Sequence, residues 1–130
     1  MRGVQVGKSA RALLAQTVAI FSTKTASQAI LPTTISQVNA GYFTALALQN
    51  PGQAAASITI ELRSASGSLI SATSLSLLSG NRIQRELSEW FRGKVSFGSY
   101  LRIVSNQPVQ MLGLLGNDAS GTVIPVPVLI

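Results

Sequence analysis

The chain has 130 residues, a length that suits one domain with a hydrophobic core of its own. Its residues are 46% hydrophobic and 11% charged, which excludes intrinsic disorder because disorder requires low hydrophobicity and high charge. Cysteine and histidine are absent, so the sequence excludes a disulfide framework and lacks the commonest metal ligands. We therefore predict one folded domain that holds neither a metal nor a cofactor.

The formal net charge of +6 is concentrated near the N-terminus. Residues 1–29 contain no acidic residue and four basic ones, namely Arg2, Lys8, Arg11 and Lys24. The rest of the chain is nearly neutral, because acidic side chains offset most of its basic ones. A high overall charge is therefore weak support for nucleic-acid binding, and we do not expect nucleic acid as a partner.

The first 29 residues have the order of a secretory signal peptide. A basic stretch precedes a weakly apolar run at 12–21, and Ser27 and Ala29 supply the small residues that an export peptidase requires. Gln16 and Thr17 interrupt the apolar run, so a short amphipathic helix and an additional strand remain alternatives. In an assembly, residues 16–22 would pair as a strand with a neighbour's open sheet edge.

These features predict how the chain is divided into two segments and where the protein is located. The apolar run is much shorter than the roughly 20 residues that cross a bilayer, so we expect no transmembrane helix. We predict that residues 1–29 form a basic N-terminal segment, either signal-like or an assembly strand, and that residues 30–130 form a β domain. A signal-like segment implies a secreted or cell-surface protein.

Short runs of alternating polarity begin the β domain. Residues 42–48 end at an Asn-Pro-Gly turn, and residues 57–63 point Ile58, Ile60 and Leu62 to one side. In the next run, 68–78, the apolar residues change parity, which predicts a bulge or bend near Thr73.

The periodicity then changes to that of a helix. Ile83, Leu87, Trp90 and Phe91 are spaced at i, i+4, i+7 and i+8, which predicts a short helix over residues 84–91 across one end of the sandwich. Gly93 is expected to stop this helix.

The C-terminal part predicts three more strands. Residues 99–105 and 109–115 are predicted as two strands joined through residues 106–108. The second of them is apolar on both faces, which is typical of a central or interface-covered strand. Residues 122–128 contain Pro125 and Pro127, which cannot donate ladder hydrogen bonds, so this strand is expected at a sheet edge.

Six or seven strands at this spacing suit an immunoglobulin-like antiparallel β-sandwich of about seven strands with one short helix. Positions 31–128 also resemble a family of immunoglobulin-like modules found in large secreted or surface proteins of bacteria. The resemblance implies an appendage or repeat without a known shared active site. It is carried by Tyr42-Phe43-Thr44-Ala45-Leu46-Ala47-Leu48-Gln49-Asn50-Pro51-Gly52, residues 58–62 with 64–67, residues 86–91 and residues 101–109.

The few acidic residues give no support for an enzyme. Glu86 and Glu89 lie at helical spacing from Arg82 and Arg85, which predicts surface ion pairs. The other two carboxylates lie on the polar face of a strand and in a turn, namely Glu61 and Asp118. We therefore assign no catalytic residue and expect a non-enzymatic protein.

The sequence leaves two functions open. The first is a structural or adhesive module that acts through its sheet edges on protein partners, including copies of itself, with an apolar tail as interface at Val126, Val128 and Ile130. The alternative is a module that binds glycan or another ligand through exposed aromatic side chains, for which the candidates are Tyr42, Trp90 and Tyr100.

Overall fold

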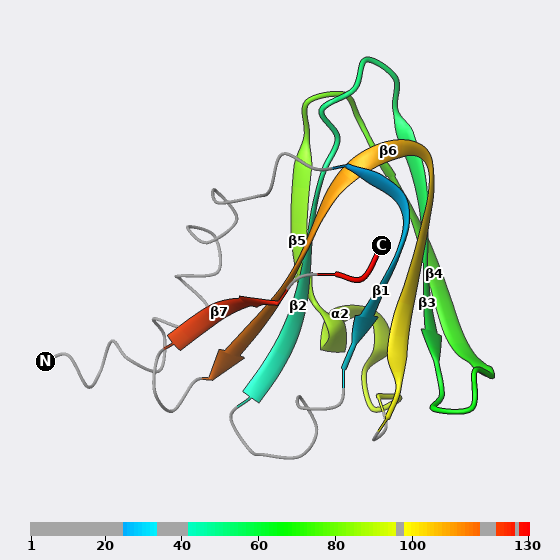
Figure 1. Ribbon diagram of the computed structural model, residues 1–130, viewed down its shortest axis with the longest axis vertical. Coiled ribbons are helices and arrows are strands. Elements are labelled where there is room, and N and C mark those ends of the chain that lie inside the picture. Colours follow the sequence, from blue (N-terminus) through cyan, green and yellow to red (C-terminus); the bar gives the residue numbers. More distant parts are fainter. Residues whose placement is uncertain (1–24, 34–41, 96–97, 118–121, 127) are drawn as a thin grey trace, which may run out of the picture.

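Seven antiparallel strands and one short helix make up the fold, in a sheet that curls into a half-barrel (Figure 1). The computed structural model describes residues 25–33, 42–95, 98–117, 122–126 and 128–130. The all-β prediction is therefore confirmed. The elements are β1 (Ala26–Pro32), β2 (Tyr42–Gln49), β3 (Ala56–Arg63), β4 (Leu69–Leu77), β5 (Arg82–Glu86), α2 (Leu87–Phe91), β6 (Tyr100–Asn117) and β7 (Thr122–Val126).

The long strand β6 connects the two halves of the sheet. Its first part lies between β1 and β3, and its second part lies between β2 and β7. We call β4, β3, the first part of β6 and β1 layer A, and β5, β2, the second part of β6 and β7 layer B. Figure 1 shows β6 arching from one layer to the other.

The prediction of two separate strands at 99–105 and 109–115 was wrong, because β6 is continuous through the bend. Its pairing with β1 jumps from Gln28↔Val104 to Ala26↔Val109, so the extra residues of β6 form an irregularity there. Within it, the hydroxyl of Ser105 donates to the carbonyl of Gln107 over 2.6 Å. The same hydroxyl oxygen accepts a hydrogen bond from the amide of Gln107 at 3.2 Å. These two bonds lie within the proline-containing bend that the sequence indicated as a turn.

The main core lies between the two layers. Ile58, Ile60 and Leu62 point inward from β3, as predicted, and pack in one cluster with Leu46 and Leu48 of β2. Each such side chain stabilises the fold by about 1.5–3 kcal/mol when it is removed from water. At one end, α2 closes the space between the layers (Figure 1).

The helix is shorter than predicted. Ile83 and Gln84 belong to β5, where they pair with Leu48 and Ala47, and the helix spans only Leu87–Phe91. Ile83 has the sequence spacing of a helical core residue, but it pairs with β2 as part of a strand. Its side chain still packs against the main core from that strand. The helix ends before Gly93, whose φ of 71° lies in the left-handed region, as the sequence predicted.

The predicted bulge near Thr73 was also placed wrongly. Strands β3 and β4 pair regularly from Ala56↔Leu77 to Leu62↔Ser71, and the irregularity comes at the next pair, Arg63↔Leu69. The inward positions of β4 keep one parity but change from leucine to Thr73 and Ser71. The inward side chains of this strand therefore become polar toward Ser71, whereas the alternation of inward and outward positions continues unbroken through Thr73.

A second buried cluster lies on the other face of layer B, made of Ala45, Ala47, Leu112 and Leu114. This cluster confirms that the second part of β6 is central and apolar on both faces. The proline-containing strand β7 pairs with β6 at the edge of layer B, as predicted.

Strand β1 crosses the expected boundary between residues 29 and 30. Ala29 is buried, and Leu31 is fully buried in the main core. Residues 1–24, which include the signal-like and strand-forming stretches of the sequence, lie outside the described residues. The described fold therefore begins inside the segment that the sequence separated from the domain.

Candidate interaction surfaces

The edge strand β4 lacks the features that usually protect a sheet edge. Four of the described strands pair in a ladder on one side: β4 pairs with β3, β5 with β2, β7 with β6 and β1 with β6. Strand β5 carries Arg82, Arg85 and Glu86, and β7 carries Pro125. Strand β1 carries Pro32 and is bridged through Ile30 to Leu129 on its other side. In contrast, β4 reads Leu-Ile-Ser-Ala-Thr-Ser-Leu-Ser-Leu. Charges and prolines discourage the pairing of foreign strands, so β4 is the edge that is open to it.

Apolar side chains are exposed at both ends of β4. Leu69 is 54% exposed and Leu78, just past the strand, is 60% exposed, with Ile70 beside the first of them. The sequence has no charged residue between Arg63 and Arg82. A partner strand on this edge would therefore meet neutral side chains along its whole length.

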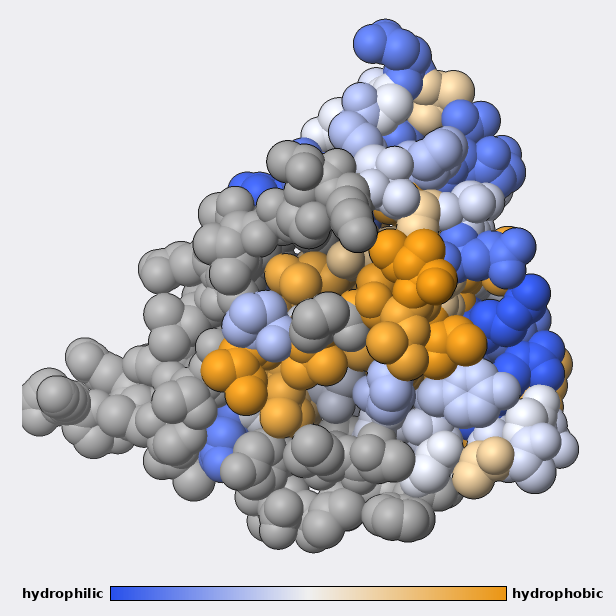
Figure 2. All heavy atoms as spheres, in the orientation of Figure 1, coloured by the Kyte–Doolittle hydropathy of each residue, from blue (hydrophilic) through white to orange (hydrophobic). Residues whose placement is uncertain are grey.

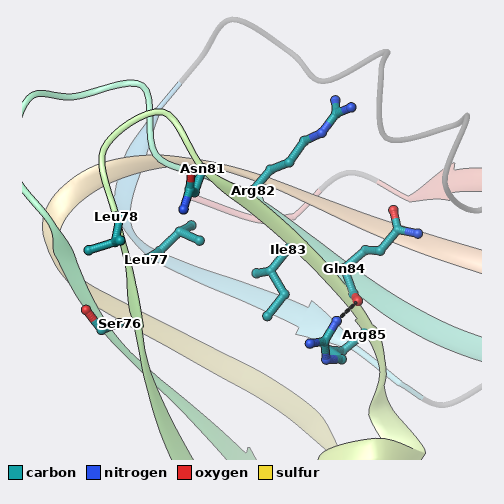
Figure 3. Close-up of a pocket in the computed structure, with 8 residues that line it drawn as sticks. All are labelled: Ser76, Leu77, Leu78, Asn81, Arg82, Ile83, Gln84 and Arg85. Atoms are coloured by element: carbon teal, nitrogen blue, oxygen red, sulfur yellow. Dashed lines mark hydrogen bonds between the residues drawn. The ribbon is translucent and has the colours of Figure 1, made fainter.

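A hollow of about 550 Å³ lies between β4 and β5, next to the turn that joins them (Figure 3). Leu77 and Ile83 lie on its two sides, and Arg82 and Gln84 point away from it. On the β5 side, Arg85 donates to the carbonyl of Gln84 over 2.8 Å. The layers therefore stay separate here, and β4 and β5 face solvent as two different edges. The lining residues are Ser76, Leu77, Leu78, Asn81, Arg82, Ile83, Gln84 and Arg85.

Arg85 of β5 forms one of the surface ion pairs that the sequence predicted. The guanidinium of Arg85 lies 3.6 Å from the carboxylate of Glu89, one helical turn further along the chain. Glu89 also accepts a hydrogen bond from the backbone of Glu86, which caps α2. This carboxylate is thus held in an ion pair and a helix cap, a structural role.

A charged triad lies on the outer face of layer A. Oε1 of Glu61 accepts hydrogen bonds from Arg63 Nε at 2.9 Å and from Arg102 Nη1 at 3.2 Å. The bond from Arg63, together with that from Arg102, holds the pKa of the Glu61 carboxyl below its ordinary value. The carboxylate stays ionised and links β3 to β6, as its predicted place on a polar face implied.

The C-terminal residues form an apolar patch against β1. Ile30 and Leu129 exchange two backbone hydrogen bonds of 2.8 Å, and Ile130 is 76% exposed. Figure 2 shows apolar surface gathered over β1 and this end of the chain. A hollow of about 190 Å³ beside them is also lined by Gln28 and Arg102. Of the predicted tail residues, Ile130 is exposed, whereas Val126 and Val128 pack partly buried against the core.

The two candidate aromatic side chains that the structure describes, Trp90 and Tyr100, lie in different parts of the fold. Trp90 packs against the core and meets Phe91 edge-on, with ring centroids 6.4 Å apart. Tyr100 pairs with Arg63 at the start of β6, so its side chain lies on the outer face of layer A. The side chain of Tyr42 lies outside the described residues. The two described rings therefore lack the shared platform that stacking on a sugar requires.

The buried side chain of Asn50 is a structural site that sequence reasoning missed. Its amide donates to the carbonyls of Ala54 and Leu77, at 2.8 and 2.9 Å, and its oxygen accepts from the amide of Gly52 at 3.0 Å. The Asn-Pro-Gly sequence indicated a turn, but nothing local indicated that Asn50 would fasten this turn to the end of β4.

Two kinds of feature are absent from the described residues. No group of three or more acidic side chains lies close enough together there to hold a metal ion. No described helix has the length and apolar character that crossing a membrane requires.

Comparison with known proteins gives a likeness of fold. No family model matches the chain, and no curated protein matches its sequence. Among solved structures, it is similar to the crystal structure of Thermotoga maritima 1070, with a TM-score of 0.64 and 14% sequence identity. The match covers 81% of this chain and 93% of that one. At this identity, the likeness concerns the fold alone.

Proposed function

We propose that this domain is a non-enzymatic structural or adhesive module that joins polypeptides through the free edge of β4. The observation that carries the proposal is an uncharged, proline-free edge strand that begins with the exposed Leu69 and Ile70 and is followed by the exposed Leu78. An extended segment laid along β4 would satisfy its unpaired backbone groups, and neighbouring side chains would add apolar contact.

The proposal includes an immunoglobulin-like description of the sandwich and a secreted or cell-surface location. The resemblance of positions 31–128 to modules of bacterial surface proteins supports both. Two facing layers of antiparallel strands are consistent with that description.

Selection of peptides on the immobilised full chain tests this function. A displayed library of random extended peptides is the probe, and selected peptides are then compared on the wild type and on Thr73→Lys. Thr73 points inward from β4 and is partly buried, so a lysine there must extend past the edge and obstruct pairing. We expect affinity to fall at least about tenfold, or about 1.4 kcal/mol.

Ser57→Lys is the matched control, because it adds the same charge on the outer face of β3, away from the edge. Ser71→Lys, at the next inward position of β4, replaces Thr73→Lys if that variant does not fold. Peptides that bind the β4 variants as tightly as the wild type, or a library that yields no binder, would overturn the proposal.

A further inference from the structure

We propose that the strand accepted by β4 is β4 of a second copy, paired antiparallel in a register centred on Ser74. The inference rests on the proposed function and names its partner. It gives a dimer in which one sheet runs continuously from one copy to the other.

The register follows from symmetry and from the pairing that β4 already makes. A two-fold axis perpendicular to the shared sheet keeps the inward faces of both copies on one side, so one residue must lie opposite itself. Regular pairing with β3 covers Ser71 to Leu77, and the irregularity lies beyond Ser71. The middle residue of this regular segment is Ser74.

Side-chain sizes complement one another in this register. On the inward face, Leu75 lies opposite Thr73 of the second copy, and Leu77 lies opposite Ser71 of the second copy. On the outer face, Ala72 meets Ser76 of the second copy, while Ser74 meets its own equivalent. Within Ser71–Leu77, each leucine therefore faces a smaller side chain, and the half-buried Leu75 gains an apolar diagonal neighbour, Leu75 of the second copy.

The distribution of charge favours β4 over β5 for self-pairing. Two copies of a chain with a net charge of +6 repel each other, and like charges opposite one another weaken a strand pair. Strand β5 carries Arg82, Arg85 and Glu86 within five residues, so a contact between two β5 strands would place charged side chains within the new ladder, where they discourage pairing. Pairing of β4 with itself places no charged residue within the new ladder.

Single-cysteine cross-linking gives a sharp test, because the chain contains no cysteine. In Ser74→Cys the two introduced thiols would lie directly opposite, with Cβ atoms about 4.5–5.5 Å apart, close to the separation in a disulfide. In Ser76→Cys, the matched control on the same exposed face, the equivalent thiols would lie roughly 14 Å apart along the strands. We expect Ser74→Cys to form the linked dimer at least about tenfold faster.

A mixture of Ala72→Cys and Ser76→Cys is expected to give the mixed dimer, because these positions oppose each other. Cross-linking that is equally fast at 74 and 76, or a wild-type chain that sediments as a monomer at every concentration, would overturn the inference. If β4-dependent peptide binding persists in that case, the proposed function stands and the partner is another protein. If peptide binding is absent as well, both fall.

Discussion

Leu31 of β1 occupies the space beside Gly113 of β6. A Cβ added to Gly113 would lie 2.5 Å from Leu31 Cδ1 and 2.7 Å from the carbonyl oxygen of Val126. The leucine side chain can move, but the backbone of β7 cannot move without breaking its ladder. We therefore expect Gly113→Ala to lower the free energy of unfolding by about 1–3 kcal/mol in chemical denaturation. An unchanged midpoint would show that β1 and β7 do not pack on β6 as described.

Asn50 is expected to be sensitive to a nearly isosteric change. Asn50→Asp replaces an amide that donates to two carbonyls with a carboxylate that faces them, so we expect a loss of about 3 kcal/mol at neutral pH. Burial beside carbonyl oxygens raises the pKa of such a carboxyl, so part of the loss should be recovered in acid. Asn81→Asp, on an exposed side chain, is the control. Equal stability of the two variants would contradict the role of Asn50.

Acid is expected to weaken the triad around Glu61. Because the folded-state pKa of Glu61 lies below its ordinary value of 4.5, the triad stabilises the fold fully above that value. This contribution is lost as the pH falls through the folded-state pKa. The difference in unfolding free energy between the wild type and Glu61→Gln should therefore shrink below the ordinary value, and added salt should reduce it at neutral pH. A difference independent of pH would rule out the ion pairs as its cause.

Opposite charges at Ser74 should control association. Ser74→Lys places two lysines opposite each other in the proposed dimer, and Ser74→Glu places two glutamates there. Each variant should associate more weakly than the wild type by about 0.2–1 kcal/mol, whereas their equimolar mixture should recover the association. Sedimentation equilibrium measures all three, with Ser57→Lys as a control for charge alone. A mixture that associates no better than its components would contradict the Ser74-centred register.

Local pattern was sufficient for the strands whose two faces differ in polarity. Ile58, Ile60 and Leu62 alternate with polar residues, and the structure buries all three. It was insufficient where pairing decides the conformation. Ile83 fits both a helix and a strand, and its partner Leu48 makes it a strand. Pro108 suggests a chain reversal, yet β6 continues past it because β1 pairs on both sides of the bend.

The candidate surfaces, like the strands, could be predicted from the sequence only in part. The absence of charge around β4 is visible in the sequence, but its position at an edge depends on the strand order, which places β5 beside β2 rather than beside β4. Similarly, the sequence predicted that Val126, Val128 and Ile130 would be exposed together. The antiparallel bridge between Ile30 and Leu129 sets this part of the tail beside β1, and of those three side chains Ile130 remains exposed.

Hydrogen exchange along β4 tests the central claim most directly. The amides of Ser71–Leu77 that point away from β3 should exchange rapidly in dilute solution. They should become protected as the concentration rises or as a selected edge-binding peptide is added, while those on the outer edge of β5 should not. Exchange in β4 that responds to neither concentration nor peptide would contradict the claim that this edge accepts a strand.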